Sequence, residues 1–179
     1  MDLRAALKEQ YHRGLAMLTQ CVERCPEDLW IAANPATDQS APWGGFERSF
    51  WRIAFHCAYF THLYLGQGED AFEPPGQEAM RRPEFDEMWH APWSLEPYEL
   101  PVGVEPSTRA DILDYIGYVD GRVDPTVDGL DLDTAASGFS WYPRQTKLSH
   151  ELLNLRHLQG HVGQLSELLM ARGIDIDWR

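Results

Sequence analysis

Residues 153–165 read LNLRHLQGHVGQL. His157 and His161 stand four positions apart in this segment, which places their side chains about 40° apart on a helix, one turn above the other. Such a pair can direct two imidazoles at one metal ion. The pair borders an apolar stripe, so we expect both rings to point into a seam of a helical bundle. That stripe consists of Leu155, Leu158, Val162, Leu165 and Leu169.

The same periodicity extends over three further segments of the chain. Apolar residues recur at spacings of three and four in each of them, and alternation with a period of two is nowhere sustained, so we predict an all-α protein. A proline or a glycine marks the expected end of each segment. We expect helices over residues 2–25, over residues 46–65, from Ser107 or Thr108 to Pro125, and from Lys147 or Leu148 to Gly173.

Long connections separate the four predicted helices. About twenty residues lie between the first and second, about forty between the second and third, and about twenty between the third and fourth. Connections of this length permit crossovers between parallel helices, and two crossovers give an up-up-down-down four-helix bundle. We expect one domain over residues 1–179. A structureless middle linker of this length is uncommon, so residues 77–90 are expected to form a short extra helix.

The composition is that of a globular chain and argues against several partners. The chain has 179 residues and a formal net charge of −13. Binding to phosphates needs clustered Lys and Arg, so we expect neither nucleic acid nor an anionic membrane surface as a partner. No run approaches the roughly 20 apolar residues of a membrane span, and no targeting pattern is visible, so we expect a cytoplasmic protein.

The three cysteines, Cys21, Cys25 and Cys57, do not predict disulfides. Cys21 and Cys25 stand four apart on a predicted helix and could share a metal or form a redox pair. We favour the alternative that they are small residues near a helix end, before Pro26.

A metal held by His157 and His161 needs a third ligand from another helix. His56 and His62 both lie on the predicted second helix, but six residues place them about 240° apart, so one of them can face the site. His56 lies nearer the apolar stripe and is the better candidate, although a packed, hydrogen-bonded histidine remains an alternative. His150 is interpreted as a solvent-exposed residue near a helix end. His12 and His90 have no supporting context.

Two segments resemble the signature helices of the DinB-like family, which includes the YfiT-type metalloenzymes. They are WRIAFH at residues 51–56 and NLRHLQGHVGQL at residues 154–165. The resemblance implies a four-helix bundle, a homodimer, and a divalent metal site formed by His56, His157 and His161. Asn154 and Gln164 flank the histidine pair on the same strip and are expected to orient the imidazoles.

The resemblance also implies a class of reactions. Three imidazoles leave coordination positions open, as in catalytic metal sites. The family is described as metal-dependent hydrolases, and some members resemble S-transferases that use a low-molecular-weight thiol, so we expect a small-molecule substrate. The alternatives are a non-catalytic metal-binding or ligand-binding module in stress response or interaction, and a bundle whose histidines bind no ion. Zinc or nickel is the expected ion, with iron, manganese and copper as further options.

The sequence contains no evident general acid or base for such a reaction. Tyr59, Tyr64, Asn154 and Gln164 are possible neighbours of the ion, and none of them is a convincing proton-transfer group. Aromatic residues are expected to form the walls of the pocket mouth, with ordinary loop packing as an equal alternative. These residues are Trp43, Trp89, Trp93 and Trp141.

Overall fold

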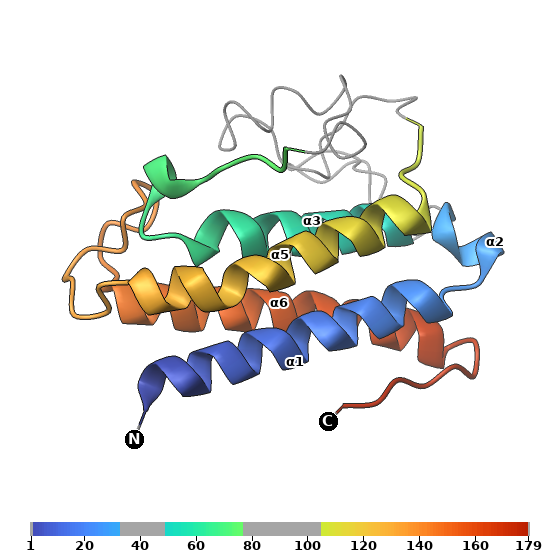
Figure 1. Cartoon of the computed structure of the whole chain (residues 1–179). Helices are drawn as coiled ribbons and strands as arrows, with labels where there is room; N and C mark the ends of the chain where they lie inside the picture. The colour runs from blue at the N-terminus through green and yellow to red at the C-terminus, as the bar shows by residue number, and fades with distance from the viewer. Residues whose placement is uncertain (1, 33–48, 77–104, 179) are drawn as a thin grey trace.

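Four long helices lie side by side in the computed structural model of the chain (Figure 1). The structure describes residues 2–32, 49–76 and 105–178. No strand occurs within these ranges, which confirms the all-α prediction. The long helices are α1 (Leu3–Arg24), α3 (Phe50–Leu65), α5 (Arg109–Gly129) and α6 (Lys147–Met170), and the short ones are α2 (Glu27–Trp30) and the 3-10 turn η1 (Glu69–Ala71).

The start of α5 is fixed by a capping box. The Thr108 hydroxyl accepts from the Asp111 backbone N–H at 3.1 Å, and the Asp111 carboxylate accepts from the Thr108 N–H at 2.9 Å. This confirms Thr108 as one of the two expected caps. The end of α5 was predicted wrongly: the helix continues through Pro125 to Gly129. Because Val123 and Val127 are both buried, packing of this last turn outweighs the hydrogen bond that the proline removes.

Contacts between the helices set their directions. Lys8 of α1 pairs with Asp128 at the end of α5, so these helices are antiparallel. The Tyr11 hydroxyl donates to the Glu151 carboxylate at 2.7 Å near the start of both α1 and α6, so these two are parallel. Figure 1 shows that α3 and α5 run parallel to each other and antiparallel to α1 and α6.

The helix order is therefore up, down, down, up, and this differs from the expected up-up-down-down order. A long connection permits a crossover but does not require one. Of the helices that follow one another in the chain, α3 and α5 are parallel. Helices α1 and α3 are antiparallel, and so are α5 and α6.

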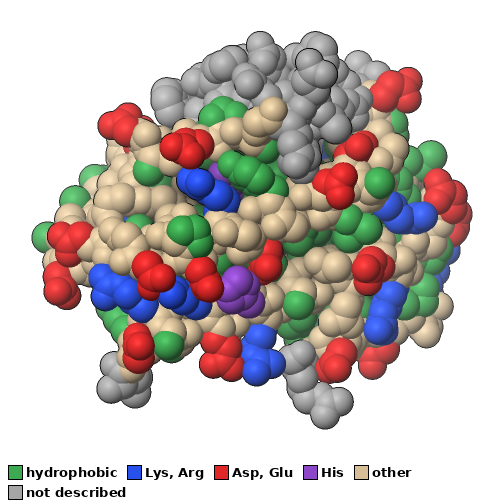
Figure 2. Space-filling view, in the orientation of Figure 1, with side chains coloured by type: hydrophobic (Ala, Val, Ile, Leu, Met, Phe, Trp, Pro, Cys, Tyr) green, Lys and Arg blue, Asp and Glu red, His purple; other side chains and the backbone are tan. Residues whose placement is uncertain are grey.

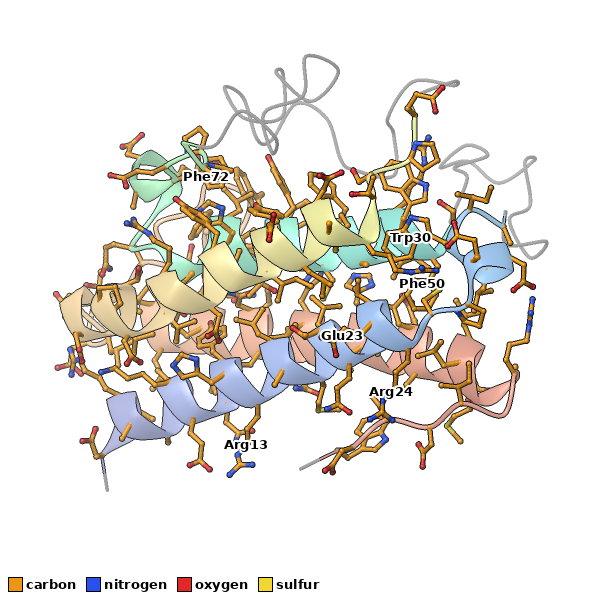
Figure 3. All side chains as sticks on the ribbon, turned by 45° about the vertical axis from the view of Figure 1, so that its right-hand side comes forward. Arg13, Glu23, Arg24, Trp30, Phe50 and Phe72 are labelled. Carbon is orange, nitrogen blue, oxygen red and sulfur yellow. The ribbon has the colours of Figure 1, made fainter. Side chains whose placement is uncertain are left out.

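Helix α3 is the central element of the core, since all of its residues are buried. At the beginning of α3, Phe50 packs against Trp30 of α2 with ring centroids 6.0 Å apart (Figure 3). On the opposite flank, α1 approaches α6 closely at Gly14, where an added Cβ would lie 2.6 Å from Leu158 Cδ2. Because every residue of α3 is buried, the polar side chains of this helix lie inside the molecule.

On the face formed by α1 and α5, charged side chains of both signs are interspersed (Figure 2). Lys8, His12 and Arg13 each pair with an acidic residue there. Because charges of both signs are interspersed, the described part of this face offers no continuous basic patch of the kind that phosphate binding requires. Among the described residues, no helix is long and apolar enough to cross a membrane.

Candidate metal centre

Helices α3 and α6 bring His56, His157 and His161 together. The Nε2 atom of His157 lies 3.1 Å from Nε2 of His56 and 3.0 Å from Nε2 of His161. One ligand nitrogen from each ring fits within 4.8 Å of the others, and this is the one group of metal-binding side chains found in the described ranges. The phase argument that chose His56 over His62 thus selected the residue that reaches the histidine pair.

The distances between these nitrogens suit a shared ion better than hydrogen bonds. The Nε2 atom of a neutral imidazole carries either one proton or one lone pair. The Nε2 atom of His157 can therefore form a good hydrogen bond with only one of the two neighbouring Nε2 atoms. Nitrogens that bind one ion at ~2.0–2.1 Å stand roughly 3 Å apart, as observed here. The three side chains therefore form a cluster that could hold a metal ion.

Burial keeps His157 in the protonation state that a ligand needs. Burial, together with the charge of the neighbouring His161, lowers the pKa of His157 to about 3. The His157 ring is consequently neutral at physiological pH, with a lone pair available for coordination. His56 is buried as well, and its ring packs on Phe60 with centroids 4.6 Å apart.

Gln164 orients one of the histidines, as the sequence predicted. The His161 Nδ1 and the Gln164 side-chain oxygen lie 2.8 Å apart. If Nδ1 of His161 donates this hydrogen bond, its Nε2 keeps the lone pair that faces the cluster. Gln164 thereby selects the tautomer of His161 that can bind an ion.

Asn154 does not have the role that was expected of it. Its side-chain amide donates to the Thr61 backbone carbonyl of α3 at 3.0 Å, and the structure gives it no contact with the histidine cluster. The expectation followed from the shared helical strip, but Asn154 lies deeper between α3 and α6. Asn154 therefore ties α6 to α3 at the Thr61 carbonyl. The Thr61 hydroxyl itself donates to the Cys57 carbonyl.

The remaining described histidines lie elsewhere. His62 is buried on another side of α3, where its Nδ1 lies 3.0 Å from the Tyr115 hydroxyl. His12 bridges Asp120 and Asp124 on the surface, a context that the sequence did not reveal.

The solvent-exposed interpretation of His150 is wrong. The ring is fully buried and stacks on Phe139 with centroids 4.3 Å apart, because residues 137–142 fold over the first turn of α6. His90 lies outside the described residues.

The aromatic neighbours of the cluster differ in part from those expected. Tyr64 packs edge-on to His157, with ring centroids 6.1 Å apart. The ring contacts of Trp141 in the described ranges are with Phe139 and Tyr142, so ordinary loop packing is the interpretation that holds for it. Trp43, Trp89 and Trp93 fall outside the described residues, as does the short helix expected over residues 77–90.

Two buried polar residues near the start of α3 were not predicted from the sequence. Ser49 and Arg52 are 3% exposed each, and they precede His56 by seven and four residues, so all three share one face of the helix. The signal was present in the spacing of these residues, because most positions between them are apolar. It was missed because an arginine and a serine near a helix start usually face solvent.

The three cysteines, Cys21, Cys25 and Cys57, are buried and free. Burial raises the pKa of Cys25 to about 11 and that of Cys21 to about 12. Neither thiol belongs to a metal-binding group in the described part of the chain.

The sequence pattern of one protein family matches residues 10–165, and that family is the DinB superfamily. The chain belongs to the DinB superfamily. The matched region contains all three clustered histidines and runs from α1 into α6. No curated protein matches the chain significantly. Membership in the DinB superfamily and the histidine cluster are both consistent with divalent metal binding.

Proposed function

We propose that His56, His157 and His161 bind one divalent metal ion and that the chain is a metal-dependent enzyme for a small molecule. The convergence of three Nε2 atoms at about 3 Å spacing carries this proposal. Three protein ligands leave at least one coordination position for a substrate. Zinc and nickel are the proposed ions, because imidazole ligands suit both.

Within the two reactions that the family resemblance implies, we favour transfer of a thiol. Hydrolysis usually requires a general base, and no described Asp or Glu joins the three histidines. Glu151, which precedes His157 by six residues on α6, is fully buried in an ion pair with Lys147. A bound ion would itself supply the activation, since it holds a substrate thiol in the thiolate form.

The chain's residues then have defined tasks. The three imidazoles hold the ion, Gln164 fixes the His161 tautomer, and Phe60 and Tyr64 pack against the ligand rings. In the reaction, the sulfur forms a bond to an electrophilic carbon and the thiol proton passes to solvent. The leaving group departs with its bonding electron pair.

The test begins with metal content. Purified protein should contain one divalent ion per chain by elemental analysis, and His157→Ala and His161→Ala should lose it. His12→Ala is the matched control, because His12 lies on the surface between α1 and α5 and should retain the ion. Loss of the ion from the control, or its retention in both ligand variants, would refute the assignment.

Activity is tested next on the metal-loaded protein. It should accelerate the substitution of the chloride of 1-chloro-2,4-dinitrobenzene by a small thiol more than the hydrolysis of p-nitrophenyl acetate. A chelator should remove the rate. The absence of a described base near the cluster also favours a second candidate, a non-catalytic metal-binding module. Equal rates for the metal-loaded protein and His161→Ala, on both substrates, would select that second candidate.

A further inference from the structure

The imidazole of His150 lies in the core without a hydrogen-bond partner. Its side chain is fully buried, and neither Nδ1 nor Nε2 has a partner within the described ranges. A neutral imidazole carries one donor and one acceptor, and leaving both unsatisfied inside a protein is unfavourable. The ring is therefore held in this position by packing alone.

Residues 137–142 supply much of this packing, and we call them the strap. Phe139 stacks on the His150 ring, and Tyr142 packs against the same ring with centroids 5.4 Å apart. The strap is fastened from outside by Glu69, whose carboxylate accepts from the Ser140 N–H and whose own N–H donates to the strap at 3.1 Å. Figure 1 shows this connection between α5 and α6 beside η1.

Tyr64 of α3 connects the strap to the histidine cluster. Its ring packs edge-on to Phe139 and Tyr142, with centroids 5.5 Å and 5.9 Å apart, and also to His150 at 5.1 Å. The same ring contacts His157. Displacement of the strap would therefore remove two aromatic neighbours from the side chain that packs on this histidine of the cluster.

A proton on His150 would be unfavourable beneath the strap. Burial, and after it the charge of Lys147, lowers the pKa of His150 to about 3. The Lys147 ammonium stands over Phe139, 5.3 Å from the ring centroid. Once the strap is displaced the imidazole meets water, and its pKa returns toward the ordinary value of about 6.5. The displaced state then binds a proton more tightly, so each pH unit below about 6.5 favours it roughly tenfold more.

The other ionisable groups around His150 have different partners. On α6, Lys147 pairs with Glu151, whose raised pKa of about 7 also places its titration in the acidic range. The partners of Glu151 are Lys147 and Tyr11 of α1, which lie outside the strap. Tyr64 and Tyr142 face the ring from α3 and from the strap, and a phenol gains no charge in acid.

We propose that the strap is an acid-sensitive cover, which is released from α6 when His150 takes up a proton from solvent. The unpartnered imidazole, the aromatic rings that enclose it and the neighbouring ammonium carry this inference. It goes beyond the proposed function, because it requires no bound ion.

Amide hydrogen exchange at pH 5.5 and pH 7.5 tests the release. The informative amides belong to the strap, among them the Tyr142 N–H, which donates to the Phe139 carbonyl at 2.9 Å. After correction for the intrinsic effect of pH on exchange, protection of the strap should be about tenfold lower at pH 5.5. Protection of the middle of α5, around Val119, should not change, because the bundle stays folded.

Variants identify the group that takes up the proton. His150→Phe keeps a ring to stack on Phe139 and cannot be protonated, so the tenfold difference should vanish. His150→Gln should give the same result and decides the question if His150→Phe does not fold. His12→Gln is the matched control, because His12 lies on the surface between α1 and α5, and it should keep the difference.

Two further variants exclude the neighbouring carboxylates. Glu69→Gln should lower protection of the strap at both pH values and preserve their tenfold ratio. The double variant Lys147→Met with Glu151→Gln should also preserve it. Circular dichroism verifies that each variant is folded.

Three outcomes would overturn the inference. The first is equal protection of the strap at the two pH values in the unmodified protein. The second is exchange of the strap only together with α5, which would mean that it opens only when the whole bundle unfolds. The third is a tenfold difference that persists in both His150→Phe and His150→Gln, since another group would then be responsible.

Discussion

A buried lysine and glutamate pair lies where α6 begins. Lys147 and Glu151 are both fully buried, with 2.8 Å between Nζ and the carboxylate, and Tyr11 donates to the same carboxylate. Burial raises the pKa of Glu151 to about 7, against the opposing effects of Lys147 and Tyr11. Burial likewise lowers the pKa of Lys147, against the effect of Glu151. Each partner therefore depends on the other to remain charged inside the protein.

We expect Lys147→Met to lower the free energy of unfolding by about 3–5 kcal/mol at pH 8, because it leaves the Glu151 carboxylate buried without a counter-charge. The loss should be smaller at pH 5. The folded-state pKa of Glu151 is raised, so the carboxyl is neutral below about pH 7 and the lysine matters less there. Urea unfolding at the two pH values measures this difference.

Two controls accompany this experiment. Lys8→Met removes an exposed ion pair with Asp128 and should cost less than about 1 kcal/mol. The double variant Lys147→Met with Glu151→Gln should recover much of the lost stability. A single variant no more destabilised than Lys8→Met would contradict the prediction.

At the scale of the elements, two segments meet at a glycine. Gly138 has a φ of +85°, and an added Cβ would lie 2.1 Å from the Gln67 carbonyl oxygen. The Gly138 carbonyl in turn accepts from the Glu69 N–H at 3.1 Å. This contact holds residues 66–71 against the segment that covers His150.

We expect Gly138→Ala to lower stability by ~1–3 kcal/mol more than Gly173→Ala. Gly173 also has a positive φ of +74°, but nothing lies within 4 Å of an added Cβ. It therefore carries only the backbone strain, about 1–2 kcal/mol. Thermal unfolding of both variants gives the difference, and equal losses would mean that the close approach at Gly138 is not constraining.

His12 links α1 to α5 in a way that depends on pH. Partial burial lowers its pKa, but the hydrogen bonds and charges of Asp120 and Asp124 outweigh burial, and the pKa is raised above 6.5. A raised folded-state pKa stabilises the protein below pH 6.5, and this stabilisation is lost as the pH rises through the folded value.

His12→Gln should therefore reduce stability more at pH 5.5 than at pH 9, as measured by urea unfolding at both values. In an Asp120→Asn background the difference between the two pH values should shrink, because one of the two carboxylates is gone. A loss from His12→Gln that does not change with pH would show that the imidazole contributes by packing alone.

At the scale of the whole molecule, the homodimer expected from the sequence stays a prediction. Leu152 of α6 is 53% exposed, and Leu3 of α1 is 38% exposed. Large apolar side chains on a helical face are typical of contact surfaces when they gather, and a two-fold axis would pair such a face with itself. Light scattering at tens of micromolar protein should give twice the chain mass, and Leu152→Lys should shift the mass toward that of one chain. A single-chain mass for the unmodified protein would contradict the prediction.

The sequence by itself determined the helices and the two histidines of α6. Helical periodicity and the spacing of four are properties of one segment, so they could be predicted without knowing what packs against it. The same argument selected His56 over His62, because helical phase is local to α3. It also placed Gln164 beside His161, one turn away.

Only the tertiary structure decided what lies opposite each face. The burial of His150 follows from residues 137–142, the pairing of Asn154 with Thr61 spans 93 positions, and the helix order follows from contacts such as Lys8 with Asp128. A pattern within one helix reports which way a side chain points but not what it meets there. Ser49 and Arg52 show the same limit: their spacing from His56 was visible in the sequence, while their burial could be read only from the folded structure.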